Sequence, residues 1–390
     1  MLRLRALAVL ALFFVSSIHL IAQAPGTGLY TFGSFDNRGF DSINIGDLNT
    51  HFEIPIVTKS GRGVPFKYTI VYDGLIWSAA GSSGSEYWVP DSGWGFHGQV
   101  NDGFAGHLNY HTQTYKCFSD PPSWYWSTRT SNYNYYDAFG QQHNFNYATD
   151  ACLGTTTGDG TTSDGSGYSF DGNTIHNHYG AVIQVPQNNV SGAGSITDTN
   201  GNVVNNNGNG TFTDTLGVTA LTIGGGGNAS SARTFTYNVA NQSDRSTSAF
   251  VTMSYRTYTI QTNFGCSDSS GSISEYGPLQ NDLVDRITLP DGTFYQFNYE
   301  PTPGVSGAVT GRLASITLPT GGIIQYQYLG DCNGNGMNAD GTIGSLNRVT
   351  TDGTRYFGRS PSPNGSVTTL QDEVGNQTRY TFTNVKWGVL

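Results

Sequence analysis

Two stretches of this sequence carry the same pattern at a fixed distance. In each, an apolar strand runs into a Leu-Pro-x-Gly turn and then into an aromatic strand, and the turn prolines Pro290 and Pro319 lie 29 residues apart. The aromatic strands end at Tyr299 and Tyr328. A unit this short is a single hairpin that cannot bury its apolar face alone, so several units must stack. The spacing therefore predicts an array of stacked β-hairpins.

Weaker copies of this pattern lie nearer the end of the chain. One copy uses Val367, Asp372, Gly375, Tyr380 and Phe382, and another uses Arg348, Asp352, Gly353, Tyr356 and Phe357. Fainter turns of the Asp-x-x-Gly kind begin near Asp137. Eight of the 23 aspartates stand directly before glycine, and a turn role, in which the carboxylate caps the turn, is expected for nearly all aspartates.

Strand signals fill the rest of the chain, and no stretch beyond the first residues shows helical periodicity. Residues 66–72, 293–299 and 323–328 alternate apolar and polar side chains, which is typical of strands with one buried face. Turn dipeptides separate the strands, among them Asp73-Gly74, Asp171-Gly172, Asn200-Gly201, Asp291-Gly292 and Asp352-Gly353. We expect an all-β protein with an N-terminal β-sandwich-like domain in residues 25–230 and a hairpin array in residues 231–390.

The first residues have the layout of a secretory signal peptide. Arg3 and Arg5 precede an apolar run over residues 6–15, and small residues follow at Ala22 and Ala24. The run is shorter than the roughly 20 apolar residues of a membrane span. We expect export, with residues 1–24 as the signal peptide and a cut after Ala22 or Ala24. An N-terminal anchor that is never cleaved is the alternative.

The charge and the cysteines constrain partners and compartment. A net charge of −10 without visible basic patches argues against nucleic-acid binding. Four cysteines in an exported chain indicate disulfides, and four allow three pairings. We favour Cys117 with Cys152 and Cys266 with Cys332, because each pair closes a loop within one region. A zinc site is not expected, since no two cysteines lie close in sequence.

The hairpin units resemble the tyrosine–aspartate (YD) repeats of the Rhs family of large exported bacterial proteins. The resemblance covers most of the mature chain and is clearest over residues 190–382. It is carried by Leu289-Pro290-Asp291-Gly292 through Tyr299, Leu318-Pro319-Thr320-Gly321 through Tyr328, Asp198-Thr199-Asn200-Gly201-Asn202, Asp214-Thr215-Leu216-Gly217, Tyr299-Glu300-Pro301-Thr302-Pro303-Gly304, Val309-Thr310-Gly311-Arg312, and the stretch from Leu48-Asn49 through Ile54-Pro55 to Tyr72-Asp73.

The resemblance implies a strand spiral that can close into a hollow shell. Full-length relatives often carry a conserved core and then a variable toxin at the C-terminus. The present sequence stops at Leu390 without either. We therefore expect the leading portion of a longer protein, or a truncated relative.

One motif is a candidate calcium site. Residues 331–336 read Asp-Cys-Asn-Gly-Asn-Gly, the first half of a calcium loop, with candidate oxygen ligands at Asp331, Asn333 and Asn335. The twelfth position is Thr342 in place of the bidentate Glu, and Asp340 could supply a carboxylate. The alternative is an Asn/Gly-rich turn held by Cys332.

No residue set has a recognisable catalytic arrangement. The glutamates are Glu53, Glu86, Glu275, Glu300 and Glu373, and none stands in a setting typical of the paired carboxylates that glycoside hydrolysis needs. Gly-x-Ser-x-Gly motifs between a strand and a helix are absent.

Five tryptophans are candidates for ligand binding: Trp77, Trp88, Trp94, Trp124 and Trp126. Exposed aromatic rings can stack on sugars. The alternative is that these rings form part of the core, where Trp and Tyr supply much of the packing.

We expect an exported, non-enzymatic scaffold that serves surface display, assembly or enclosure of cargo encoded further along. A glycan-binding adhesin and a secreted carbohydrate-active hydrolase are alternatives. No cofactor other than calcium and no membrane span after signal removal is expected. Expected partners are other copies of the chain through open strand edges, carbohydrate, and a downstream C-terminal domain.

Overall fold

The computed structural model confirms an all-β protein. It describes residues 34–91, 93–98, 106–118, 123–137, 141–188, 192–239, 247–269, 271–362 and 365–383. The expected signal peptide, residues 1–24, lies outside the described residues. Within them there is no α-helix, only the short 3-10 turn Cys332–Gly334. No helix among the described residues has the length and apolar character needed to cross a membrane.

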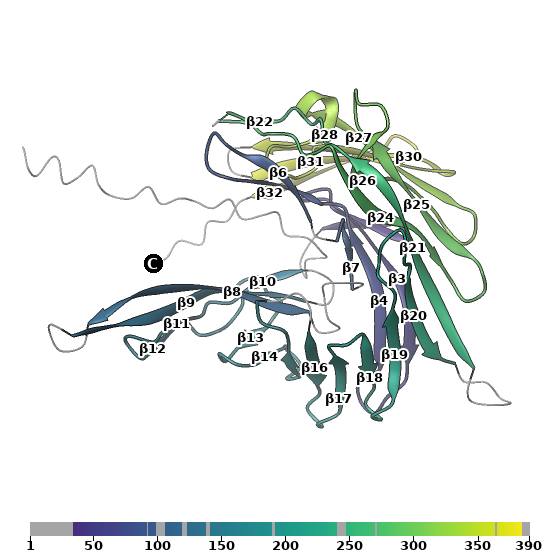
Figure 1. The fold of residues 1–390 in the computed structure, drawn as a ribbon. Coiled ribbons are helices and arrows are strands. Elements are labelled where there is room, and N and C mark those ends of the chain that lie inside the picture. The colour runs from purple at the N-terminus through teal and green to yellow at the C-terminus, as the bar shows by residue number, and fades with distance from the viewer. Residues whose placement is uncertain are drawn as a thin grey trace, which may run out of the picture.

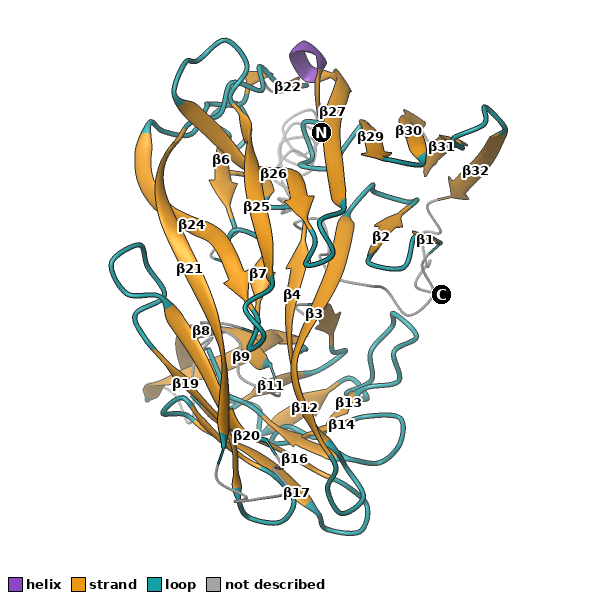
Figure 2. Ribbon diagram, turned by 90° about the vertical axis from the view of Figure 1, so that its right-hand side faces the viewer, coloured by secondary structure: helices purple, strands orange, loops and turns teal. Residues whose placement is uncertain are grey.

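The dominant element is one sheet of 18 strands, in which chain neighbours lie side by side (Figure 1). Its long strands run side by side down the molecule in the turned view (Figure 2). The strands are β13 (Ser169–Phe170), β14 (Ile175–His176), β15 (Val182–Gln184), β16 (Ala193–Thr197), β17 (Val203–Asn207), β18 (Thr211–Thr213), β19 (Thr219–Gly224), β20 (Arg233–Asn238), β21 (Ser248–Ile260), β24 (Leu279–Thr288), β25 (Phe294–Pro301), β26 (Ala308–Thr317), β27 (Ile323–Asp331), β28 (Asn335–Met337), β29 (Ser345–Thr350), β30 (Gly353–Ser362), β31 (Gly365–Gln371) and β32 (Gln377–Thr383). A separate ribbon, β22 (Ser267–Asp268) with β23 (Gly271–Ser272), lies between β21 and β24 in the chain.

The two hairpins with the Leu-Pro-x-Gly turns pair in the same register. In β24–β25 the partners are Arg286 with Gln296, Ile287 with Tyr295 and Thr288 with Phe294, and in β26–β27 they are Ser315 with Gln325, Ile316 with Ile324 and Thr317 with Ile323. Each residue of the second set lies 29 positions after its counterpart in the first. The hydroxyl of Tyr299 donates to the Val284 carbonyl at 2.7 Å, and that of Tyr328 donates to the Leu313 carbonyl at 3.1 Å, again 29 positions apart. The sequence spacing is therefore a structural repeat.

One kind of turn closes these hairpins and several others. The N–H of its first residue donates to the carbonyl of the fifth, and the N–H of the fourth, a glycine, donates to the carbonyl of the first. In the described residues this turn begins at Asn177, Asp198, Asp214, Leu289, Leu318, Asn338 and Asp372. The fourth-position glycines have φ between +74° and +93°, the left-handed region that a three-residue hairpin loop with a glycine bulge requires.

Two different sequences produce this turn. At Asp198, Asp214 and Asp372 the first-residue carboxylate accepts hydrogen bonds from the N–H groups of the third and fifth residues. At Leu289 and Leu318 a proline follows and fixes φ at the second position. The Asp-x-x-Gly and Leu-Pro-x-Gly motifs are thus two chemical solutions to the same backbone geometry.

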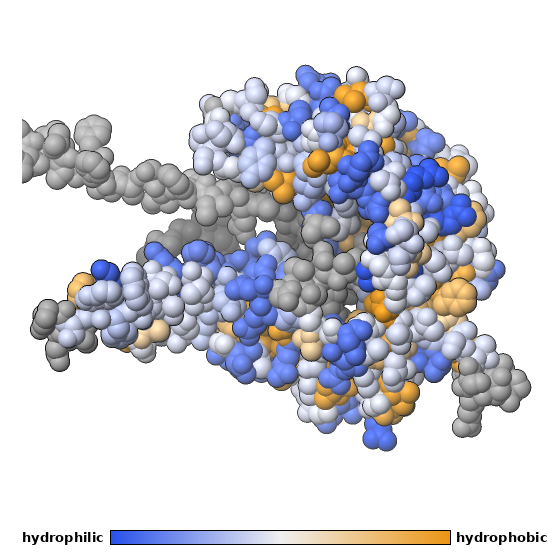
Figure 3. Space-filling model, in the orientation of Figure 1, coloured by the Kyte–Doolittle hydropathy of each residue, from blue (hydrophilic) through white to orange (hydrophobic). Residues whose placement is uncertain are grey.

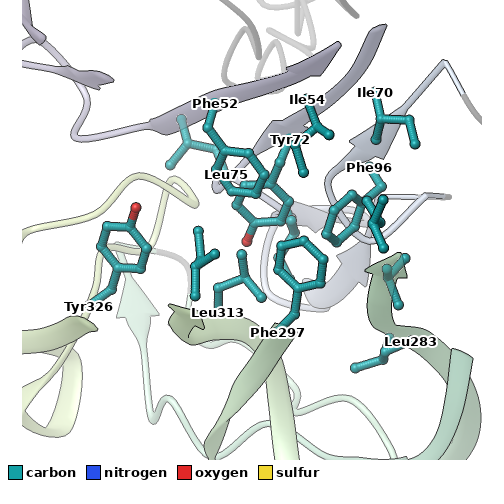
Figure 4. Close-up of a cluster of buried hydrophobic side chains, with 14 of the residues drawn as sticks. Phe52, Ile54, Ile70, Tyr72, Leu75, Phe96, Leu283, Phe297, Leu313 and Tyr326 are labelled. Atoms are coloured by element: carbon teal, nitrogen blue, oxygen red, sulfur yellow. The ribbon is translucent and has the colours of Figure 1, made fainter. Parts of the chain in front are cut away.

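A second sheet packs against the large one and completes the main core. It has the order β1-β2-β3-β4-β7. Phe52 stacks on Tyr72 at 4.9 Å between ring centroids and faces Phe297 of the large sheet at 6.1 Å (Figure 4). The strands are β1 (Phe35–Asn37), β2 (Asp41–Asn44), β3 (Thr50–Lys59), β4 (Phe66–Asp73) and β7 (Phe96–His97), with β5 (Trp77–Ala80) and β6 (Tyr87–Pro90) as a separate pair.

Three arginines of the large sheet hold the first strands in place, and we call these contacts the arginine seam: Arg348 to Asp41, Arg355 to Asp36 and Arg359 to the Gly46 carbonyl. Arg348 donates to both Asp41 carboxylate oxygens, at 2.7 and 2.8 Å, and the Tyr326 hydroxyl donates to the same carboxylate at 2.8 Å. Arg355 reaches Asp36 at 2.7 Å, and Arg359 reaches the Gly46 carbonyl at 2.8 Å. The seam joins residues some 300 positions apart, with a sequence separation of 307 for Asp41 and Arg348.

A third sheet forms an arm that stands out from the body (Figure 1). It is built on the long hairpin of β8 (His107–Phe118) and β9 (Trp124–Tyr136), to which β10 (Gln142–Asn144), β11 (Ala148–Asp150) and β12 (Thr155–Thr157) add. A second, smaller core lies at its base and includes Leu108, Tyr135, Phe170 and Ile183. The arm is therefore anchored on β13–β15 of the large sheet.

The sheets do not follow the expected boundary at residue 230. β19 and β20 pair directly across it, and the large sheet runs on without a break. The main core combines residues from both sides, from Ile43 to Leu370. The two packed layers are the β1-β2-β3-β4-β7 sheet and the 18-stranded sheet, so they are not both contained in residues 25–230.

Candidate functional site

The structure separates the five tryptophans into two groups. Trp77 and Trp88 are only 1% exposed, and the Trp77 indole N–H donates to the Thr310 carbonyl at 3.0 Å. Trp94 is half-buried and packs edge-on against Trp77 with 5.8 Å between ring centroids. For Trp77 and Trp88 the core alternative therefore holds, because β5–β6 fold onto the main core, and Trp94 packs partly buried against the same core from the loop before β7.

Trp124 and Trp126 lie at the outer end of the arm and remain exposed. Together with Phe118 and Tyr125 they form what we call the aromatic tip. The exposed fractions are 71% for Phe118, 46% for Trp124, 47% for Tyr125 and 62% for Trp126. Large aromatic side chains are usually buried, so four in one place mark a candidate interaction surface.

The strand register decides which ring faces which side. Phe118 pairs with Trp124, and Lys116 pairs with Trp126, so these four side chains share one face of the hairpin. The Lys116 ammonium lies 4.2 Å from the centre of the Trp124 ring, in a cation–π contact. Tyr125 pairs with Cys117 and points to the opposite face.

A disulfide and a hydrogen bond support the end of the hairpin on the face opposite Trp124 and Trp126. Cys117 forms a disulfide with Cys152, and Cys266 forms one with Cys332, which is the favoured pairing. The Tyr115 hydroxyl donates to the Asp150 carboxylate, and this bond raises the pKa of Tyr115 to about 12. Asp150 also accepts the Cys152 N–H at 3.0 Å, so the disulfide loop is held on the back of the hairpin.

The candidate calcium ligands are engaged in separate contacts. Asn335 donates to the carbonyls of Asn263 and Phe264, at 3.1 and 3.3 Å. The Asp340 carboxylate accepts the N–H and hydroxyl of Thr342 within its own turn. Asp331 and Asn333 lie against two different segments, at Gly344 and Gly265. The candidate ligands thus contact different parts of the chain, and no group of three or more His, Cys, Asp or Glu side chains able to hold a metal ion occurs in the described residues.

Two buried histidine–carboxylate clusters were not anticipated from the sequence. His51 is 3% exposed, and its Nδ1 lies 3.0 Å from Asp73, itself 1% exposed. Burial lowers the pKa of His51, but hydrogen bonds to Asp73 and Glu53 raise it more, to about 9. No sequence signal marks this pair, because the partners meet only through the β3–β4 register.

The second cluster joins the base of the arm to a loop. His143 is 2% exposed and lies between Asp164, at 2.5 Å, and Asp137, at 3.4 Å. Burial lowers its pKa, and the two carboxylates raise it more, to about 9. The pKa of Asp164 is lowered despite its burial, because His143 and Ser166 hydrogen-bond to the carboxylate. A cationic histidine held between two carboxylates at a sheet junction acts as an ionic clamp.

All five glutamate side chains contact other groups of the fold. Glu300 accepts two bonds from the buried Arg312, at 2.8 and 2.9 Å. The others contact His51 (Glu53), the Gly84 N–H (Glu86), the Gly265 N–H (Glu275) and Arg355 (Glu373).

A polar pocket of about 330 Å³ opens beside the arginine seam. Its lining consists of Asn37, Arg38, Gly39, Arg348, Thr350, Asp352 and Glu373. Arg348 and Glu373 already pair with Asp41 and Arg355, so the pocket belongs to the seam. Among the described residues, the aromatic tip is therefore the clearest candidate for an interaction surface.

The chain was also compared with known proteins. No family model and no curated protein matches this chain.

Proposed function

We propose that this protein is an exported, non-enzymatic scaffold of the Rhs type, in which stacked hairpins form a curved wall for display or assembly. The observation that carries the proposal is the repeat of register, turn and tyrosine hydrogen bond at 29 residues in β24–β27. Hairpins that stack in this way extend a sheet without changing its core. The resemblance of the same residues to YD repeats points in the same direction.

The wall has features that suit a structural role. The large sheet curves around β3 and β4 (Figure 1), and the arm stands apart from the part of the body that carries β32 in the same view (Figure 3). The arginine seam ties the first strands to the last ones. Two disulfides support export, because such bonds persist in oxidising compartments.

Assembly would use the last strand of the array. In the described residues β32 pairs on one side only, with β31. An edge strand presents unpaired N–H and C=O groups to another strand. We expect concentration-dependent association of the purified chain in sedimentation velocity, through addition of a strand at β32.

Two adjacent proline substitutions test this edge. Thr378 and Arg379 are both exposed, and successive residues of a strand direct their N–H groups to opposite sides. One of Thr378→Pro and Arg379→Pro therefore removes a bond to β31 and lowers stability, whereas the other removes only an outward donor. The outward variant should fold normally and remain monomeric. A wild-type chain that stays monomeric at high concentration, or an outward variant that associates like wild type, would contradict assembly through β32.

A further inference from the structure

Three turns of the fold meet around the polar pocket beside the arginine seam. Residues 37–39, where β1 turns into β2, form one wall. Arg348, Thr350 and Asp352, at the end of β29 and in the turn after it, form a second wall, and Glu373, in the turn between β31 and β32, forms a third. Its volume of about 330 Å³ lies at the lower end of the range for small-molecule sites, so a ligand that fits it is small.

The two arginines of the pocket are only partly used by the fold. Arg348 donates from Nε and Nη2 to Asp41, and its Nη1 is not buried and has no partner among the described residues. Arg38 donates from Nε and Nη2 to Asp36, and no hydrogen bond within the described part of the chain uses its Nη1. One edge of each guanidinium group therefore remains for a ligand.

The two carboxylates of the pocket also keep free oxygens. Glu373 accepts the Arg355 hydrogen bond at 2.7 Å with Oε2, which leaves Oε1 unused. Asp352 is exposed, and its carboxylate accepts no hydrogen bond from any residue that the structure describes. The pocket thus presents unused donors and unused acceptors, both on charged side chains.

This pairing of charges selects one class of ligand. A polyanion would be repelled by the two carboxylates and a simple cation by the two guanidinium groups. No aromatic ring lines the pocket for a sugar to stack on, and an apolar molecule would leave the charged groups unpaired. We propose that the pocket binds a small zwitterion, a free amino acid or a dipeptide, whose carboxylate pairs with Arg38 and Arg348 and whose ammonium pairs with Asp352 and Glu373.

Such a ligand bridges the two parts that the arginine seam joins. Arg38 lies between the first strands, whereas Arg348, Asp352 and Glu373 belong to the hairpin array. A molecule that binds only the folded state raises its stability by mass action. The ligand therefore strengthens the attachment of the first strands to the array.

The test is isothermal titration calorimetry of the full chain, together with its thermal unfolding midpoint. The probes are the standard L-amino acids and L-alanyl-L-alanine. We expect at least one probe to bind and to raise the unfolding midpoint. The N-acetyl derivative of that probe lacks the ammonium and its amide lacks the carboxylate, so each should bind weaker by on the order of tenfold or more.

Single variants locate the site. Arg38→Gln and Asp352→Ser each remove one charge from a side chain that is not buried, and each should weaken binding by on the order of tenfold. Their unfolding midpoints without probe should stay close to that of the wild type. The matched control is Arg256→Gln, since Arg256 is 66% exposed on β21, and it should bind as the wild type does.

Three results would overturn the proposal. The first is that no amino acid or dipeptide binds the wild type. The second is that the N-acetyl derivative or the amide binds as tightly as the free probe, which would indicate a site for one charge only. The third is that Arg38→Gln and Asp352→Ser both bind as tightly as Arg256→Gln, which would place the ligand elsewhere.

Discussion

The arginine seam gives the most quantitative prediction. The side chains of Asp41 and Arg348 are 0% and 7% exposed, and they are joined at 2.7 Å. Removing one partner of a buried ion pair leaves an uncompensated charge, which costs about 3–5 kcal/mol. Asp41→Ala also deprives the buried Tyr326 hydroxyl of its acceptor, which adds about 1–3 kcal/mol. Because whole domains are stable by only about 5–15 kcal/mol, either change should shift unfolding strongly.

Matched variants separate this effect from simple loss of contacts. Arg38 pairs with Asp36 at 3.1 Å, but its side chain is 35% exposed, so Arg38→Ala should cost less than about 1 kcal/mol. The double variant Asp41→Leu/Arg348→Met replaces both charges with apolar groups and should recover most of the loss. The assay is equilibrium unfolding in urea. Single variants no less stable than Arg38→Ala, or a double variant whose cost equals the sum of the single ones, would refute the reasoning.

Two further predictions concern the turns and the pH dependence of stability. Gly321 has φ +85°, and a Cβ at that position would meet no atom within 4 Å, so Gly321→Ala should cost about 1–2 kcal/mol from backbone conformation alone. Gly322→Ala, at an ordinary φ with contacts of 3.7 Å or more, should be neutral or slightly stabilising in the same thermal unfolding experiment; equal effects of the two would contradict the turn assignment. Because the pKa of His143 is raised, the contacts of its cationic ring with Asp137 and Asp164 stabilise the fold fully below the ordinary pKa of 6.5. This stabilisation is lost as the pH rises through about 9. That difference corresponds to roughly 3 kcal/mol, so His143→Asn should remove a large part of the stability decline between those pH values, and the part due to His51 should remain. An unchanged pH profile in His143→Asn would count against the clamp.

The hairpin repeats could be predicted from the sequence because the residues that determine each turn lie close together in the chain. A proline or an aspartate, followed by glycine at the fourth position, determines the turn within five residues, and the turn sets the register of its strands. Fixed register then places Tyr299 and Tyr328 at equivalent positions. The all-β class followed from the same kind of local evidence, whereas the favoured disulfide pairing rested on each pair closing a loop within one region.

The candidate sites were harder to predict from the sequence, because the burial and the contacts of their side chains depend on residues far away in the chain. Trp77 is buried because Phe264 and Tyr276 pack on it, and no short-range pattern indicates that contact. Asn335 has the spacing of a calcium ligand, but its amide donates to the distant Phe264 carbonyl. Only Trp124 and Trp126, at the end of a projecting hairpin, kept the exposure that a binding role needs.

The first strands and the hairpin array form one structural unit, with a main core that spans both. Amide hydrogen exchange of the full chain, followed by mass spectrometry, tests it directly. We expect β1–β2 to be protected as strongly as β29–β31, and we expect Ile287 and Ile316, at equivalent places 29 residues apart, to open together. Rapid exchange of β1–β2 while the array stays protected, or protection of only one of the two hairpins, would contradict it.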